Sequence, residues 1–245
     1  MALLPLAGVH APDAASIWDE VRSVQPEPER GLVIATALLA ALAVFAPGLW
    51  YYTRYAVTIA HEGGHGLVAV LTGRRLEGIR LHSDTSGLTL SVGKPRGPGM
   101  VATSAAGYLT PALLGLASAG LLAVDRITAL LWIDIVLLAA LAVMVRNVYG
   151  WLLMLAIGAA FFAVSLLAST QTQAGFAYLV AWFLLIAAPK PVFELQRRRR
   201  RGRARHSDAD QLAAITGVGG LAWVCFFAVI CLGALALGGY WLLLP

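Results

Sequence analysis

Charged side chains are scarce in this chain of 245 residues. Asp, Glu, Lys and Arg together make up 13% of it, which is about half the share found in soluble domains. Hydrophobic residues make up 59%, which is more apolar surface than a soluble fold of this length can bury, and which also excludes an intrinsically disordered chain. The composition therefore predicts a membrane protein that crosses the bilayer several times.

Cysteine is also scarce, which excludes a disulfide scaffold. The two cysteines, Cys225 and Cys231, lie six residues apart in one apolar stretch, so on a helix they face different sides and are not expected to form a bridge. The net charge of +5 comes largely from Arg197–Arg201 and the arginines just after it, where no base-stacking aromatic residues are interleaved. We therefore expect this run to contact anionic lipid headgroups rather than nucleic acid.

Seven apolar runs have the length or composition of membrane spans. The prediction is an all-α polytopic membrane protein of about seven transmembrane helices, in which one membrane-embedded domain, residues 31–245, follows a segment of residues 1–30. Pro47 and Pro111 should kink or interrupt their helices. A short surface helix is expected within residues 12–24. The seven runs lie at about 31–50, 55–72, 101–124, 127–145, 149–168, 174–188 and 217–244.

The basic residues give the predicted orientation. With a cytoplasmic N-terminus and seven spans, only Arg54 and Arg126 fall outside, which satisfies the positive-inside rule. The C-terminus would then lie outside, and a basic cytoplasmic loop would occupy residues about 189–212. The loop of residues 73–100 alternates apolar and polar residues around a turn sequence, which predicts a cytoplasmic β-hairpin.

The predicted second span contains the sequence His61-Glu62-Gly63-Gly64-His65, an H-E-x-x-H motif. Residues four apart lie on one helix face about 6 Å apart along the axis, so His61 and His65 can bind one metal ion, and zinc suits nitrogen ligands. Glu62 follows the first ligand by about 100° and can act as the general base. Hydrogen bonding between helices is the alternative use of these side chains, but it needs neither this spacing nor this order. The site should lie in the bilayer, about 12 Å from the cytoplasmic end of its helix.

Four strings of the chain carry a family resemblance: His61–Arg75, Ser86–Thr89, Ala106–Tyr108 and Ser207–Leu212. With them the chain resembles the site-2 protease group of intramembrane zinc metalloproteases, and within it the B-like branch of the membrane metallopeptidase family. The resemblance extends from about residue 55 to the end of the chain. It implies a zinc peptidase fold in which His61 and His65 bind the metal and Glu62 is the base.

The third metal ligand is not fixed by the sequence. Classical site-2 proteases take it from an Asp-Gly pair, which this chain lacks. Asp208, behind the expected N-cap Ser207, belongs to a family-like string and is our prediction, although an acid there also compensates the helix dipole. Asp210 is a second candidate ligand, and it too could serve only to compensate the helix dipole. Asp134 is a third candidate, because its depth in the predicted fourth span is near that of His61. His82 with Asp84 could also bind a metal, but solvated loop residues are the simpler interpretation.

The predicted function is intramembrane zinc endopeptidase, acting on the transmembrane segments of other membrane proteins. The resemblance suggests that the hairpin holds an unwound substrate by strand addition. Because the Asp-Gly pair is missing, an alternative stays open. The protein could be a catalytically inactive relative of these proteases that acts as a membrane scaffold or chaperone. A metal transporter is a third alternative, but it should show polar residues aligned through several spans.

Overall fold

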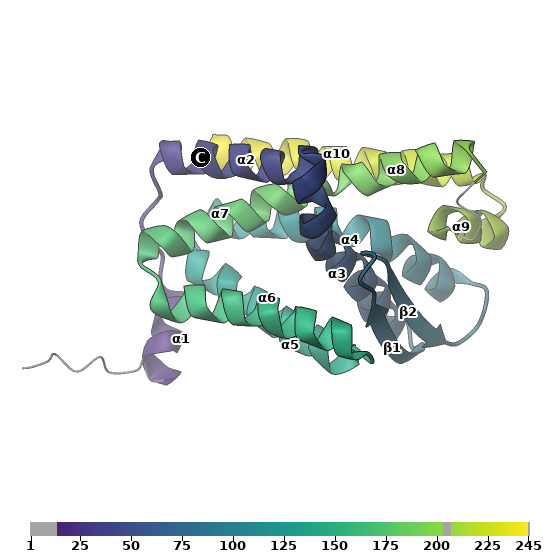
Figure 1. The fold of residues 1–245 in the computed structure, drawn as a ribbon, viewed down its shortest axis with the longest axis horizontal. Helices are drawn as coiled ribbons and strands as arrows, with labels where there is room; N and C mark the ends of the chain where they lie inside the picture. Colours follow the sequence, from purple (N-terminus) through teal and green to yellow (C-terminus); the bar gives the residue numbers. More distant parts are fainter. Residues whose placement is uncertain (1–13, 203–206, 245) are drawn as a thin grey trace, which may run out of the picture.

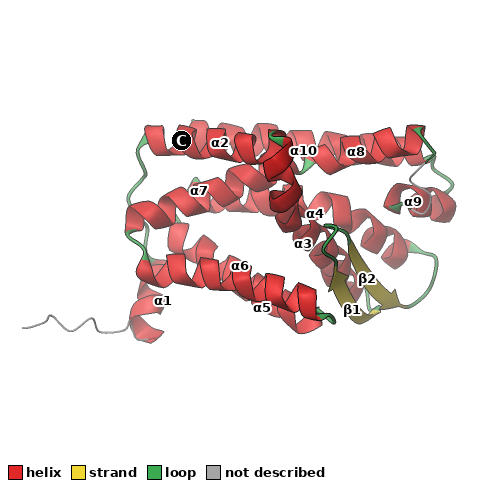
Figure 2. Cartoon of the chain, in the orientation of Figure 1, coloured by secondary structure: helices red, strands yellow, loops and turns green. Residues whose placement is uncertain are grey.

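The structure is a computed structural model that describes residues 14–202 and 207–244. It is a bundle of long helices with one small hairpin of strands at one end (Figures 1 and 2). In chain order, its elements are α1 (Ala14–Arg22), α2 (Arg30–Phe45), α3 (Pro47–Leu71), β1 (Arg75–Leu81), β2 (Gly87–Val92), α4 (Pro98–Leu122), α5 (Ile127–Met144), α6 (Val148–Leu167), α7 (Thr170–Ala187), α8 (Pro189–Arg200), α9 (Asp208–Thr216) and α10 (Gly220–Leu243).

Helix α4 is the centre of the bundle and packs against α3, α7 and α10. Its buried face carries mainly small residues, which let the neighbouring backbones approach closely. A Cβ atom on Gly115 would lie 2.9 Å from the backbone nitrogen of Leu185, so only glycine fits there without a shift. Pro111 lies inside the helix and does not interrupt it.

The predicted count of seven spans is not confirmed. Among the described residues, five helices are long and apolar enough to cross a membrane, or six if α2 and α3 are counted together. Helix α2 has 16 residues and is about 24 Å long, short of a bilayer core of about 30 Å. Pro47 is the first residue of α3, a position where the backbone N–H that proline lacks would have no acceptor within the helix. The chain turns by 101° between the two helices.

Helix α2 runs parallel to α7, whereas seven complete crossings would make these two helices antiparallel. A Cβ atom on Gly175 would lie 3.4 Å from Leu32 near the start of both helices, and the Lys190 ammonium donates to the carbonyl of Val44 at the other end. Arg126 donates to the carbonyl of Arg22, so these two arginines share one end of the bundle. The seven-span prediction separated them because it treated residues 31–50 and 55–72 as two complete crossings.

The predicted β-hairpin is present, and its strands pair antiparallel. Its turn is stabilised by Asp84, whose carboxylate accepts from the backbone N–H of Ser86 at 3.0 Å. The Asn147 amide, between α5 and α6, bonds both the N–H and the carbonyl of Leu81, at 3.1 and 2.7 Å. The hairpin is thereby fixed to the bundle beside α3, which it contacts along one face.

Candidate metal centre

The two histidines of the H-E-x-x-H motif lie on the face of α3 that packs against α4. Their Nε2 atoms are 3.1 Å apart. The Oδ2 atom of Asp208 lies 3.2 Å from Nε2 of His61 and 3.4 Å from Nε2 of His65. The chain thus brings together two imidazole nitrogens from α3 and one carboxylate oxygen from α9, more than 140 residues later.

Asp208 and Asp210 have different surroundings, although both lie in the first turn of α9. Asp210 accepts from the hydroxyl of its N-cap residue Ser207 at 2.7 Å and forms an ion pair with Arg199. Its carboxylate is therefore used in stabilising the helix start and holding α8. Asp208 has no such role and points at the two histidines, so of these two acids only Asp208 is placed to bind a metal with them.

The other predicted candidates lie apart from this cluster. Among the described residues, the one group of three potential ligands within reach of a single ion consists of His61, His65 and Asp208. Asp134 instead lines an apolar cavity of about 440 Å³ together with Gly63, on the far side of α3 from the histidines.

His82 and Asp84 lie in the turn of the hairpin, where both hydrogen bond to Ser86. Neither belongs to a group of three potential ligands among the described residues. The interpretation as solvated loop residues, with Asp84 stabilising the turn, fits these contacts.

Helix α4 fixes the orientation of both imidazoles. Nδ1 of His65 lies 2.7 Å from the carbonyl oxygen of Thr103; because a carbonyl only accepts, Nδ1 carries a proton. Nε2 is thereby directed toward the position of a metal and, without the metal, toward Asp208. The Tyr108 ring meets the His61 ring edge to face at 4.8 Å. A Cβ atom on Gly107 would lie 2.6 Å from Cε1 of His61, so a side chain there would displace the imidazole.

Glu62 extends from the same helix toward strand β2. The Thr89 hydroxyl lies 2.6 Å from Oε2 of Glu62 and donates to it, which directs the carboxylate. A Cβ atom on Gly87 would lie 2.7 Å from the other carboxylate oxygen. Glu62 is 6% exposed, so the hairpin holds the one acid of the motif in a confined position next to the histidines.

The ionisation of Asp208 agrees with a ligand role. Its helix, α9, is outside the candidate membrane spans. Burial disfavours the charged carboxylate, but hydrogen bonds and attraction to His61 and His65 outweigh burial and hold the pKa of Asp208 below its usual range. A metal ligand must be deprotonated, and Asp208 meets that requirement at neutral pH.

The three ligand atoms fit a tetrahedral zinc ion. Zinc bonds of about 2.0–2.1 Å in a tetrahedron place neighbouring ligand atoms about 3.3–3.4 Å apart, close to the three distances of 3.1, 3.2 and 3.4 Å. Two histidines and one carboxylate are a donor set of catalytic zinc sites, in which the fourth position stays open. The side chains of His61 and Asp208 are 20% and 21% exposed, so the cluster can be reached from outside the protein.

A methyl group at Gly107 should disrupt this centre. In Gly107→Ala, the new Cβ collides with both imidazoles, and we expect bound zinc to fall by at least about tenfold while the protein still inserts. The control is Gly120→Ala in the same helix, whose Cβ would meet Trp241 at an ordinary 3.6 Å. Both changes improve helix propensity by up to about 1 kcal/mol, so a loss of zinc in both would contradict the steric explanation.

Several residues of the site were not assigned roles from the sequence. Thr89 and Gly87 lie in a family-like string, and so does Gly107, but nothing in those strings indicates what each side chain contacts. Thr103 carried no signal, because its contribution is a backbone carbonyl that any residue could supply.

Comparison with known proteins agrees with these observations. A family model described as Peptidase M50B-like matches residues 34–238, a range that includes α3, the hairpin, α4 and α9. No curated protein and no solved structure matches the chain significantly. The chain therefore belongs to the Peptidase M50B-like family, a site-2 protease-like family of membrane metallopeptidases.

Proposed function

We propose that the protein is an intramembrane zinc endopeptidase and that His61, His65 and Asp208 are its metal ligands. The observation that carries this proposal is the convergence of their three ligand atoms beside the carboxylate of Glu62. When bound there, zinc would supply a Lewis acid and would activate water for hydrolysis near neutral pH.

The chain's own residues have distinct parts in the reaction. Glu62 removes the proton of the attacking water and later delivers it to the leaving amine. The Thr89 hydroxyl, 2.6 Å from Oε2, keeps that carboxylate oriented. The Thr103 carbonyl holds His65 in the required tautomer. Each of these groups is in place before a substrate arrives, which lowers the cost of reaching the transition state.

The proposed substrate is a transmembrane segment of another membrane protein. A helical peptide bond is shielded by its own backbone, so the segment must unwind before attack. Strand β2 is an edge of the two-stranded sheet and lies next to Glu62, which supports strand addition as the way an unwound segment is held. In this proposal, residues 31–245 form a single membrane-embedded domain that both binds and cleaves the substrate.

The inactive-relative alternative depended on the absent Asp-Gly pair. The carboxylate of Asp208, 3.2 and 3.4 Å from the two histidines, supports a third ligand that does not need such a pair. A metal transporter needs polar residues along a path through the bundle. Within the described spans, Asp134 is the acid that lacks a partner at one oxygen, and it faces an apolar cavity. We therefore prefer the peptidase.

We also propose a revised topology of six spans, with α2 and α3 as one bent crossing. Both ends of the membrane domain would then lie on the outer side. The hairpin and the arginine run of α8 would lie on the cytoplasmic side. This arrangement keeps most basic residues inside, as the positive-inside rule requires.

Thiol labelling of intact cells tests this topology. In a background without Cys225 and Cys231, we expect Ser23→Cys and Leu244→Cys to react with a membrane-impermeant reagent. Lys94→Cys should react only after permeabilisation. All three positions are exposed. Labelling of Ser23→Cys and Leu244→Cys from opposite sides would contradict six spans and restore an odd number.

A further inference from the structure

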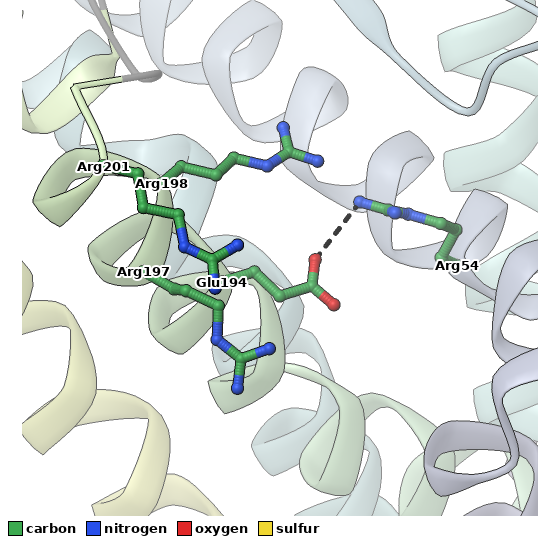
Figure 3. A pocket seen from close by; sticks show the side chains of 5 residues that line it. All are labelled: Arg54, Glu194, Arg197, Arg198 and Arg201. Atoms are coloured by element: carbon green, nitrogen blue, oxygen red, sulfur yellow. Dashed lines mark hydrogen bonds and ion pairs between the residues drawn. The ribbon is translucent and has the colours of Figure 1, made fainter.

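A basic pocket lies between α3 and α8, at the end of the bundle that carries the hairpin. Figure 3 shows Glu194 reaching toward Arg54, with Arg197, Arg198 and Arg201 around it. The pocket has a volume of about 450 Å³, within the range of small-molecule sites. Helical spacing explains why these side chains meet, because residues 194, 197, 198 and 201 lie three or four positions apart, on one face of α8 and its C-cap.

The single acid of this pocket is already occupied. Glu194 accepts from the indole N–H of Trp50 at 3.1 Å and pairs with Arg54 at 3.5 Å. Within residues 14–202 and 207–244, the one further ion pair of α8 is Arg199 with Asp210, on another side of the helix. Three guanidinium groups of the pocket therefore lack an acidic partner there, and the pocket favours an anion.

An apolar groove adjoins the basic pocket and shares Glu194 and Arg197 with it. The groove, of about 580 Å³, lies between α2, α8 and α10. Its apolar walls include Phe45, Phe193 and Leu232, which are 68%, 55% and 45% exposed. Helix α10 is a candidate span and α2 belongs to the bent pair that counts as one, so in a bilayer this groove would face hydrocarbon.

The junction of pocket and groove lies where the uncharged helix α7 gives way to the charged helix α8. Helix α7 carries no charged residue, and the first charge after it is Lys190, whose ammonium lies 4.2 Å from the centre of the Trp50 ring. A change from apolar to basic side chains is typical of the boundary between hydrocarbon and headgroups. On this ground we place the groove in the hydrocarbon layer and the arginines at headgroup level.

We propose that the pocket and the groove together bind one anionic phospholipid of the adjoining leaflet. The phosphate of the headgroup lies among Arg197, Arg198 and Arg201, and an acyl chain fills the groove along Phe45 and Leu232. An acidic peptide would use the basic pocket alone and leave the groove empty, so the combination favours a lipid. This is a discrete site, which goes beyond a general attraction of the arginine run to the membrane surface.

The bound lipid would connect the arginine helix to the metal-binding helix. Arg54 precedes His61 by seven residues, almost two full turns of α3, and so lies on the same face. The headgroup would touch both α8 and the Arg54–Glu194 pair. Binding itself requires neither zinc nor catalysis.

Native mass spectrometry of the protein released from bilayers of equimolar phosphatidylglycerol and phosphatidylcholine tests the site. We expect one phosphatidylglycerol to be retained per chain. Each arginine lost should lower retention about fivefold, so Arg197→Gln with Arg201→Gln should nearly abolish it. The matched control, Arg75→Gln with Arg80→Gln, removes two exposed charges from the hairpin and should retain the lipid.

A second variant tests the groove separately. Leu232→Trp should fill the groove and lower retention with every arginine intact. Glu62→Gln should retain the lipid as the unchanged protein does, because the site is independent of peptidase activity.

Equal retention of the two lipids, or equal loss in the arginine variant and its hairpin control, would overturn the proposal. Complete displacement by millimolar inorganic phosphate, with no effect of Leu232→Trp, would assign the pocket to free phosphate instead. If Arg197→Gln with Arg201→Gln lost only the cleavage of acidic substrates and retained the lipid, the basic pocket would be assigned to a peptide.

Discussion

Replacement of Glu62 by Gln should lower the rate of peptide cleavage by a factor of about 10² or more while bound zinc stays unchanged. Gln has nearly the size of Glu and keeps an oxygen for the Thr89 hydroxyl, which lies 2.6 Å from the carboxylate. It cannot take a proton from water, and general bases contribute about 10²–10⁴ to a rate. The measurement is turnover of a transmembrane peptide by purified protein, with zinc measured in the same samples.

The control for this variant is Glu77→Gln in the hairpin. Glu77 is an exposed acid paired with Arg75, and its loss should leave turnover within about twofold, as expected for an exposed ion pair of small energy. Normal cleavage by Glu62→Gln would show that another group is the base. Loss of zinc together with activity would mean that Glu62 holds the metal site together.

The second large effect is expected at Asp208. Asp208→Ala removes the carboxylate oxygen that lies 3.2 and 3.4 Å from the two imidazoles. Two histidines alone are an incomplete set for catalytic zinc. Loss of a residue that only supports a ligand typically costs 10–100-fold in metal affinity, so loss of a ligand should exceed that range. Zinc and activity should fall together, as they should in His61→Ala.

Two other acids provide the contrast. Asp210→Ala breaks the pair with Arg199 and the bond from Ser207, so it should destabilise the start of α9 and reduce zinc only mildly. Asp134→Ala should leave zinc unchanged, because Asp134 faces the apolar cavity behind α3. If zinc fell in Asp134→Ala and not in Asp208→Ala, the ligand assignment would be wrong. If zinc fell in none of the three, an inactive relative would be favoured.

The sequence was sufficient for features that depend on local spacing. The H-E-x-x-H motif predicts two histidines on one helix face because four residues make about one turn. The hairpin follows from alternation around a turn sequence, and Ser207 as an N-cap follows from its position before two acids. Each of these patterns is contained within one segment of the chain.

Features that depend on distant segments were not predictable in the same way. Whether Asp208 or Asp210 faces the histidines depends on Arg199, which takes Asp210 for an ion pair. The topology depends on a turn of 101° at Ala46–Pro47, and a proline alone does not distinguish a kinked span from a sharp turn. The sequence does not distinguish the arginines of the run from one another. In the structure, Arg199 pairs with Asp210, whereas Arg197, Arg198 and Arg201 line the basic pocket.

The central claim, cleavage within the membrane by this zinc centre, is tested most directly by mass spectrometry of membrane proteins. Cells that carry the unchanged protein would be compared with cells that carry Glu62→Gln. We predict fragments whose new ends lie inside membrane-spanning segments, present with the unchanged protein and absent with Glu62→Gln. The same set of fragments in both samples, or no fragment cut within a span in either, would contradict the assignment of this protein as an intramembrane endopeptidase.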